Sequence, residues 1–238
     1  MYICALLLPG PAAPPVFAQS ADALYADRDN LASARRAADL WSAALASNPR
    51  DFESAWKLSR ADYWLGGHAP ESEERGFYEK GIEAGRRAIA IDMGKPEGHF
   101  WVGANMGALA ESAGLGAGLK YRKPIKTELE TVLRLDPGFL QGSADRALGR
   151  WYFKVPRLFG GSHKQAEEHL KAALKYKNDS TVTHYFLAEL YADDGRIAEA
   201  RAELQKVLDA PLDPEWTPED QEWKTKGRQL LTTLKSQR

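Results

Sequence analysis

The sequence predicts an all-α protein, a right-handed solenoid of about four to five helical hairpins with a C-terminal capping helix. A spacing of four and then three residues between small, bulky and aliphatic side chains recurs along the chain. Its copies are Ala37-Trp41-Ala44, Ala84-Ala88-Ile91, Ile125-Leu129-Val132, Ala166-Leu170-Ala173 and Ala200-Leu204-Val207. Residues at this spacing share one helical face, and a proline five residues after each of the first three copies marks where the helix stops. No stretch of β-branched residues alternates as a strand would. Such repeated hairpins bury their faces only by stacking on their neighbours, which is the property of a solenoid.

Glycine and proline divide the first part of the chain into three hairpins. Their helices are expected at about 21–28, 30–47, 51–65, 71–91, 96–112 and 123–135. Glycine-rich segments at 66–70 and 114–122 are expected to be loops between them.

The fourth and fifth hairpins follow with shorter helices. An aromatic helix ends near Phe153, a loop spans 155–161, and Ser162 opens the next helix as part of a capping box. The fifth hairpin turns tightly at 193–196. A Thr-Pro pair then begins a last amphipathic helix over about 218–235, which we expect to cap the array.

The N-terminal residues predict an export leader. Before the first charged residue lie an apolar run from Ile3 to Leu8, several prolines, and Val16-Phe17-Ala18-Gln19. Small or aliphatic residues three and one positions before a cut suit signal peptidase, so we expect a leader over 1–18 and a helical repeat domain over 19–238. The apolar core is short and has no basic flank, so we expect the leader to be truncated; the alternative is a disordered apolar leader. Export to the bacterial periplasm is the favoured interpretation.

Composition excludes several classes of function. The formal net charge of −1, from 32 basic and 33 acidic residues, provides no overall field for nucleic acid. A membrane span needs about 20 consecutive apolar residues, and none is expected here. Cys4 is the only cysteine and falls in the expected leader, so the mature chain has no disulfide or thiol chemistry.

The last two hairpins resemble tetratricopeptide repeats. The residues that carry this resemblance are Leu148-Gly149, Tyr152, Ala166, Leu170 and Ala173, and then Leu187-Ala188, Tyr191, Ala200, Leu204 and Val207. The chain also resembles the T component of TRAP transporters, because an aromatic segment at 98–105 is paired with segments at 149–156 and 159–162. A similar arrangement is found in the eukaryotic regulators of microtubule dynamics. The resemblance implies a periplasmic helical protein that oligomerises and works beside a solute-binding protein delivering small organic solutes.

Candidate binding residues lie on the first helices of the middle hairpins, which line the concave face in such repeats. Arg146, Arg150 and Lys154 recur every four residues and therefore share one helical face. Arginine holds a carboxylate in a bidentate way, and nearby aromatic rings cover an apolar tail, so a small organic acid is a candidate ligand. The full candidate set is His99, Trp101, Asn105, Arg146, Arg150 and Lys154. The alternatives are ion pairing between adjacent helices for the arginines and a packing role for His99.

Other motifs have simpler interpretations. The segment 114–120 contains three glycines and a lysine, but it lacks the Gly-Lys-Ser/Thr and the preceding strand of a phosphate loop. A basic cluster of Lys120, Arg122, Lys123 and Lys126 is either a solvated face or a site for phosphate or an acidic partner. No two histidines share a helical face at metal-binding spacing and no catalytic constellation is present, so we expect no metal, no cofactor and no enzyme.

Two functions therefore remain. The first is an accessory protein of a TRAP-type transporter that binds a partner protein, a small organic solute, or both, with a homo-oligomer as one form it could take. The second is a general tetratricopeptide scaffold for protein–protein interactions in the cell envelope. A closed pocket between the third and fourth hairpins would favour a solute, whereas an open groove would favour a peptide.

Overall fold

The computed structural model of this chain describes residues 20–236, so the expected leader over 1–18 lies outside the described residues. Within this range the chain forms eleven α-helices, a short 3-10 turn and no β-strand. The first six helices are α1 (Ala21–Ala26), α2 (Leu31–Ser47), α3 (Phe52–His68), α4 (Glu71–Ile91), α5 (Pro96–Ser112) and α6 (Leu115–Leu135). They are followed by α7 (Phe139–Lys154), the 3-10 turn η1 (Arg157–Phe159), α8 (His163–Ala173), α9 (Thr181–Asp193), α10 (Ile197–Asp209) and α11 (Thr217–Ser236). The predicted all-α fold class is confirmed.

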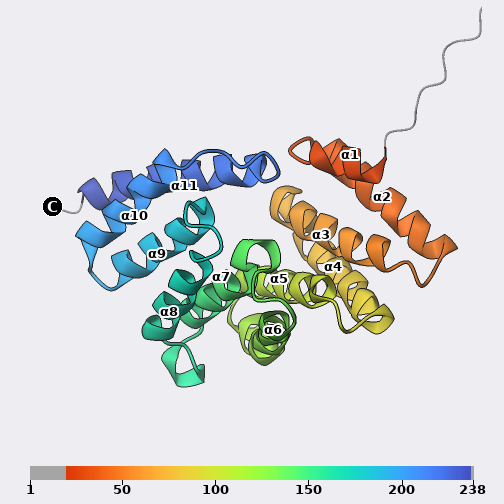
Figure 1. Cartoon of the computed structure of the whole chain (residues 1–238), viewed down its shortest axis with the longest axis horizontal. Helices are drawn as coiled ribbons and strands as arrows, with labels where there is room; N and C mark the ends of the chain where they lie inside the picture. Colours follow the sequence, from red (N-terminus) through yellow and green to blue (C-terminus); the bar gives the residue numbers. More distant parts are fainter. Residues whose placement is uncertain (1–19, 237–238) are drawn as a thin grey trace, which may run out of the picture.

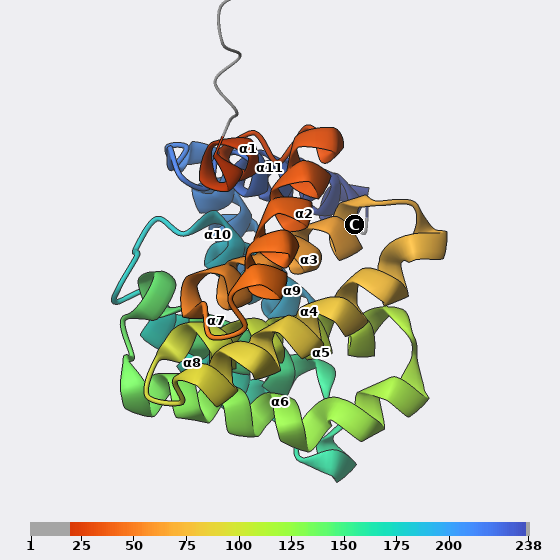
Figure 2. The ribbon, with the colours of Figure 1, turned by 90° about the vertical axis from the view of Figure 1, so that its right-hand side faces the viewer.

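Successive helices pack as antiparallel neighbours, and the hairpins curve around a common centre (Figure 1). The curvature brings α1, at one end of the array, close to α11, at the other end. Figure 2 shows α4 and α6 as long helices on the outside of the array. No helix in the part of the chain that the structure describes has the length and apolar character needed to span a bilayer.

The recurring residues of the sequence pattern form the core. Ala37, Ala88, Val132, Ala166, Ala200, Leu204 and Val207 are completely buried, and Trp41, Leu129, Leu170 and Ala173 are nearly so. Burying apolar surface stabilises a fold by about 25 cal/mol per Å², so this stripe supplies the main force that stacks one hairpin on the next.

Polar side chains determine where several helices begin. The side chains of Asn30, Asp51, Ser162 and Ser180 accept hydrogen bonds from the first-turn amides of α2, α3, α8 and α9. In the predicted capping box, Ser162 Oγ accepts from the Gln165 amide at 3.3 Å. Each cap satisfies an amide that would otherwise have no partner at the helix end.

Two predicted loops are wrong. Helix α3 continues through Gly66 and Gly67 to His68, and a Cβ atom on Gly66 would lie 2.4 Å from Tyr78 Cε1, so the glycine allows α4 to pack closely rather than ending α3. Helix α6 begins at Leu115, not near Lys123, and carries Pro124 in its interior.

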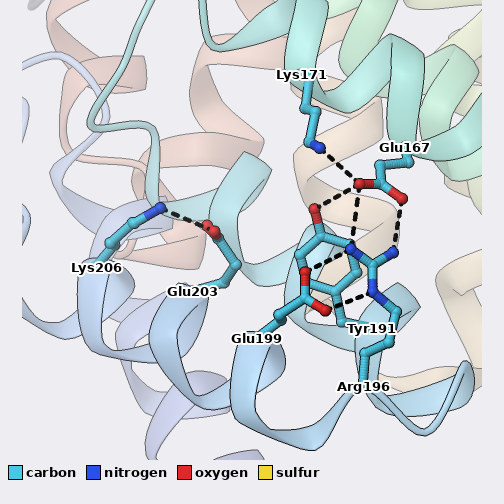
Figure 3. A network of polar contacts seen from close by, with 7 residues as sticks. All are labelled: Glu167, Lys171, Tyr191, Arg196, Glu199, Glu203 and Lys206. Carbon is cyan, nitrogen blue, oxygen red and sulfur yellow. Dashed lines mark hydrogen bonds and ion pairs between the residues drawn. The ribbon is translucent and has the colours of Figure 1, made fainter.

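A network of charges ties the predicted turn at 193–196 to α8 (Figure 3). Glu167 on α8 accepts hydrogen bonds from Arg196 Nη1 at 2.7 Å and from the Tyr191 hydroxyl at 3.0 Å. Arg196 also binds Glu199 on α10 at 2.5 Å, and Lys171 lies 2.6 Å from Glu167. Arg196 and Lys171 lower the pKa of Glu167 to about 2. The network therefore joins α8, α9 and α10 through one carboxylate.

Candidate functional site

The concave side of the array encloses a cavity of about 1090 Å³. It is lined mainly by α3, α5, α6, α7 and α11, with Val182 and Phe186 from α9, so the first helices of the hairpins face it as predicted and α6 joins them. Its aromatic lining residues are Tyr25, Tyr63, Trp64, Tyr78, Phe100, Trp101, Trp151, Phe186, Trp216 and Trp223. The lining also carries charged groups of both signs. Its acids are Glu71, Glu74, Glu111, Asp179, Asp213, Glu219, Asp220 and Glu222, and its lysines and arginines are Arg122, Arg146, Arg150, Lys154, Lys177 and Lys226. A concave site that combines aromatic walls with polar groups is typical of a small-molecule site.

Small residues on α5 keep the cavity open. Gly103, Ala104, Gly107 and Ala108 all line it, and a Cβ atom added at Gly107 would meet no other atom within 4 Å. Larger residues at these helical positions would fill the space between α5 and the opposite wall. The composition of α5 therefore produces the hollow.

Arg146 is the main electrostatic feature of this cavity. It lines the cavity, and among residues 20–236 no carboxylate forms an ion pair with it. Within the same residues its side chain donates one long hydrogen bond, 3.4 Å from Nη1 to the Gln141 carbonyl. Burial lowers the pKa of Arg146 to about 10, so the side chain is still charged at neutral pH. Arg146 is half-buried, and a partly desolvated cation without a counter-ion is a candidate for binding an anion.

Two further hydrogen-bond donors belong to the same lining. Trp101 Nε1 is buried and has no acceptor within the described part of the chain. The Tyr63 ring lies 5.6 Å from the Trp101 ring, and desolvation together with the Glu111 and Glu222 carboxylates raises the pKa of Tyr63 to about 12, with Arg146 opposing that rise. These three side chains supply hydrogen-bond donors to a lining that also contains the carboxylates of Glu111, Glu219 and Glu222.

Arg150, by contrast, is neutralised. Its Nη2 lies 3.0 Å from Glu111 Oε2 on α5, Nη1 binds Glu189 on α9, and the guanidinium stacks 4.7 Å from the centre of the Phe186 ring. This is the interhelical ion pairing that the sequence left open as an alternative. Lys154 is exposed at the rim of the cavity, with Nζ 4.9 Å from the Phe153 ring centre.

His99 and Asn105 do not line the cavity. His99 Nδ1 lies 2.6 Å from Glu128 Oε2 on α6, and Nε2 lies 3.1 Å from the Met93 carbonyl. Asn105 is completely buried, and its Nδ2 donates to the carbonyls of Ser59 at 3.0 Å and Trp101 at 2.8 Å. These two residues position α5 against its neighbours, so of the six predicted residues the structure brings Trp101, Arg146, Arg150 and Lys154 together around the cavity.

The cavity is bridged by residues that sequence reasoning did not single out. Arg28, after α1, donates from Nε to Glu219 Oε1 at 2.9 Å and from Nη2 to the Glu215 carbonyl at 2.8 Å. His68, at the end of α3, lies 3.6 Å from Glu222 on α11. No local sequence signal could have found these contacts, because Arg28 and Glu219 are 191 residues apart.

A second cluster lies on the outer surface. His163, Asp193 and Asp194 offer possible metal ligands within 4.8 Å of one another. His163 Nδ1 is already hydrogen-bonded to Asp194 at 2.6 Å, and both aspartates are exposed. This arrangement is that of an ordinary surface ion pair.

Comparisons with known proteins agree with this architecture. The crystal structure of TTC0263, a thermophilic TPR protein of Thermus thermophilus, is similar with a TM-score of 0.67 and 25% identity, over 89% of this chain and 95% of that one. The crystal structure of MamA matches with a TM-score of 0.52 and 16% identity, over 89% of this chain and 99% of that one, which supports the fold alone. No curated protein matches the sequence.

Two family models match the sequence itself. The model of regulator of microtubule dynamics protein 1-3 matches residues 17–160, and that of the TRAP transporter T-component matches residues 97–231. The two matches overlap on residues 97–160, which hold the third hairpin and the first helix of the fourth, where most of the resemblance seen in the sequence lies. Since each model covers more than half of the chain, the protein belongs to the TRAP transporter T-component family and shares its helical repeat with the regulators of microtubule dynamics.

Proposed function

We propose that this protein is a non-catalytic, exported accessory component of a TRAP-type transporter that binds a small organic acid in its central cavity. The observation that carries the proposal is Arg146, a half-buried guanidinium that lines the cavity and has no carboxylate partner among the described residues. A carboxylate from a ligand would supply the missing counter-charge.

The surrounding residues suit an acid with an apolar portion. Arg146 takes the carboxylate as a bidentate partner, and the indole N–H of Trp101 and the hydroxyl of Tyr63 are the additional donors. The aromatic walls cover the apolar part of the ligand and remove it from water. Arg150 forms ion pairs with Glu111 and Glu189 and so stabilises the cavity wall, and it does not itself bind the ligand.

The contacts that join the two ends of the array favour a solute over a peptide. Arg28 and His68 bridge the two ends of the array through Glu219 and Glu222, so the concave face is not a continuous open groove. A general envelope scaffold that docks an extended segment needs such a groove. A periplasmic solute-binding protein remains the expected partner on the outer surface, with periplasmic location following from the leader expected at 1–18.

The test is to identify what the protein retains. The protein is purified from bacterial envelope extracts, and native mass spectrometry measures bound small molecules and co-purifying proteins. We expect the wild type to carry an organic acid, Arg146→Met to lose it, and Arg86→Met, which changes an exposed arginine on α4, to keep it. Retention of the same acid by folded Arg146→Met would overturn the assignment, and a wild type that captures only peptides would favour the scaffold function.

A further inference from the structure

The segment between α7 and α8 presents apolar side chains to solvent. Leu158, at the middle of η1, is 87% exposed, and the neighbouring Phe159 is also exposed. This segment protrudes from the body of the molecule below α6 in Figure 2. Leu158 and Phe159 are adjacent and form a small exposed apolar patch, and such a patch beside polar residues is a candidate contact surface.

The turn is held in one shape. Gly160 has φ of +105°, and a Cβ atom on Gly161 would lie only 1.6 Å from the Val155 carbonyl oxygen, so both positions require glycine. The Ser162 amide also donates to the Tyr152 carbonyl at 2.9 Å. These contacts keep Leu158 at the tip of the turn.

Basic residues surround this tip, and acidic residues are absent from the chain segments that form it. Residues 112–127 and 146–166 contain no Asp or Glu. Their lysines and arginines are Lys120, Arg122, Lys123 and Lys126 in the first segment, and Arg146, Arg150, Lys154, Arg157 and Lys164 in the second. Lys120, Lys123, Lys154 and Arg157 are exposed. Arg150 is neutralised by Glu111 and Glu189, and Lys126 lies 3.7 Å from Glu130, so the local positive excess rests on the four exposed residues.

Direct contacts join the two segments into one surface. The Arg122 guanidinium lies 5.5 Å from the centre of the Phe159 ring, and Trp151 Nε1 donates to the Arg122 carbonyl at 2.8 Å. Lys126 Nζ lies 5.3 Å from the Trp151 ring centre. We call Lys120, Lys123, Lys154, Arg157, Leu158 and Phe159 the basic tip. The cavity lining reaches it through Arg122 and Lys154.

We propose that the basic tip docks on a membrane surface that carries anionic phospholipids. Leu158 and Phe159 would enter the headgroup region while the surrounding lysines and arginines contact lipid phosphates. A protruding apolar turn between separate cations suits a plane of anionic headgroups, whereas a protein partner of this chemistry would need a groove or a shaped apolar face. Docking in this way brings the rim of the cavity beside the bilayer.

Co-sedimentation with vesicles tests this proposal. The purified protein is mixed with vesicles of phosphatidylglycerol and phosphatidylcholine in equal parts, or of phosphatidylcholine alone. We expect binding to the anionic vesicles only, weakened by salt. Leu158→Asp should weaken it by about tenfold or more, because the apolar contact is lost. Lys123→Glu and Arg157→Glu should each weaken it by about fivefold or more.

Matched variants outside the basic tip test whether the loss of vesicle binding is specific to that surface. Met93→Asp changes another apolar residue, 74% exposed in the turn between α4 and α5, and Arg36→Glu reverses an exposed charge on α2. Both controls should bind anionic vesicles as the wild type does, and circular dichroism checks that every variant is folded. Equal binding to both vesicle types, or unchanged binding of folded Leu158→Asp, would overturn the proposal. Absence of vesicle binding together with tip-dependent capture of an acidic protein would show a protein-docking surface instead.

Discussion

The histidines show how single side chains link the helices of this protein. Each lies beside a carboxylate from another element: His68 with Glu222, His99 with Glu128, His163 with Asp194, His169 with Asp145 and His184 with Glu203. A lone histidine on a helix predicts nothing by itself. Its partner is chosen by how hairpins pack, so the sequence could not assign these pairs.

His68 makes part of the closure of the array dependent on pH. Burial opposes its charge, but the Glu222 carboxylate and the Trp64 carbonyl outweigh burial and raise the pKa of His68 above 6.5. His68 and Lys226 lower the pKa of Glu222 to about 2. The stabilisation by this pair is therefore complete between about pH 4.5 and 6.5 and is lost as pH rises through the folded pKa of His68.

We predict that His68→Gln lowers the free energy of unfolding more at pH 6 than at pH 9. The side chains of His68 and Glu222 are 31% and 37% exposed, so the difference should not exceed about 1 kcal/mol. The stacking of His68 on Trp64 is lost at both pH values and does not affect the comparison. Urea unfolding of the wild type and of His68→Gln at the two pH values measures this difference in unfolding free energy. An equal loss of stability at pH 6 and pH 9 would contradict the role of charge in the contact between His68 and Glu222.

Arg146 should reduce the stability of the ligand-free protein. A half-buried guanidinium without a counter-ion has lost part of its hydration, and one long hydrogen bond to the Gln141 carbonyl replaces little of it. We predict that Arg146→Met raises the free energy of unfolding of ligand-free protein by about 1–2 kcal/mol, as is common when a functional residue is removed. Thermal and urea unfolding measure this change in the free energy of unfolding. A lower stability of Arg146→Met would show that Arg146 stabilises the folded protein instead.

At the scale of elements, the start of α7 carries local strain beside the cavity. Leu140, Gln141 and Gly142 have φ values of 43°, 60° and 74°, which is the left-handed region. Only glycine occupies this region without cost. Gln141 also contributes its carbonyl to Arg146 and its side chain to Asp213. The strained turn therefore sets the position of Arg146 relative to α11.

Comparing two substitutions at Gln141 measures this strain. Gln141→Ala and Gln141→Gly both remove the hydrogen bond to Asp213, but only glycine relieves the left-handed backbone. We predict that Gln141→Gly is more stable than Gln141→Ala by about 1 kcal/mol. Urea unfolding of the two variants gives the difference, and an alanine variant of equal or greater stability would contradict the strained conformation.

Helix positions could be predicted from the sequence wherever a cap or a proline ended a periodic stripe. The ends of α2, α4 and α5 lie where the pattern placed them. The start of α6 could not be predicted, because glycines and Pro124 lower helix propensity over 115–124. Packing of Tyr121 on the core and the hydrogen bond from Arg122 Nη1 to the Leu119 carbonyl at 2.6 Å outweigh that propensity.

At the scale of the whole molecule, the curved array is held closed by very few contacts among residues 20–236. The Arg28 side chain is 5% exposed and binds Glu219 and the Glu215 carbonyl across the gap between α1 and α11. We predict that Arg28→Ala destabilises the protein by about 2 kcal/mol, because it removes the charge-assisted hydrogen bonds of a buried guanidinium and leaves the partly buried Glu219 carboxylate unpaired. Small-angle X-ray scattering should also show a larger radius of gyration.

The matched control for closure is Arg35→Ala. Arg35 pairs with Glu73 at 2.9 Å, but these side chains are 38% and 43% exposed. Arg35→Ala should therefore lower the free energy of unfolding by less than about 1 kcal/mol and leave the radius of gyration unchanged. Similar costs for Arg28→Ala and Arg35→Ala would mean that the two ends are held together by other contacts.

The repeat pattern predicted that the first helices would face a common concave side, and it placed Trp101 and Arg146 there. It did not predict the cavity, because closure depends on residues near the two ends of the chain. Nor did it distinguish Arg146 from Arg150, which share a face of one helix; only the neighbouring helices supply Glu111 and Glu189 to one of them.

The most direct test of the central claim is a titration of the purified protein with decanoate and with decanol, followed by tryptophan fluorescence. The two probes share an apolar chain and differ in the carboxylate. We predict that the wild type binds decanoate about 10- to 100-fold more tightly than decanol, the range expected for a charge-assisted contact, and that Arg146→Met removes this preference. Equal affinity of the wild type for both probes, or an unchanged preference in Arg146→Met, would contradict an acid-binding cavity organised around Arg146.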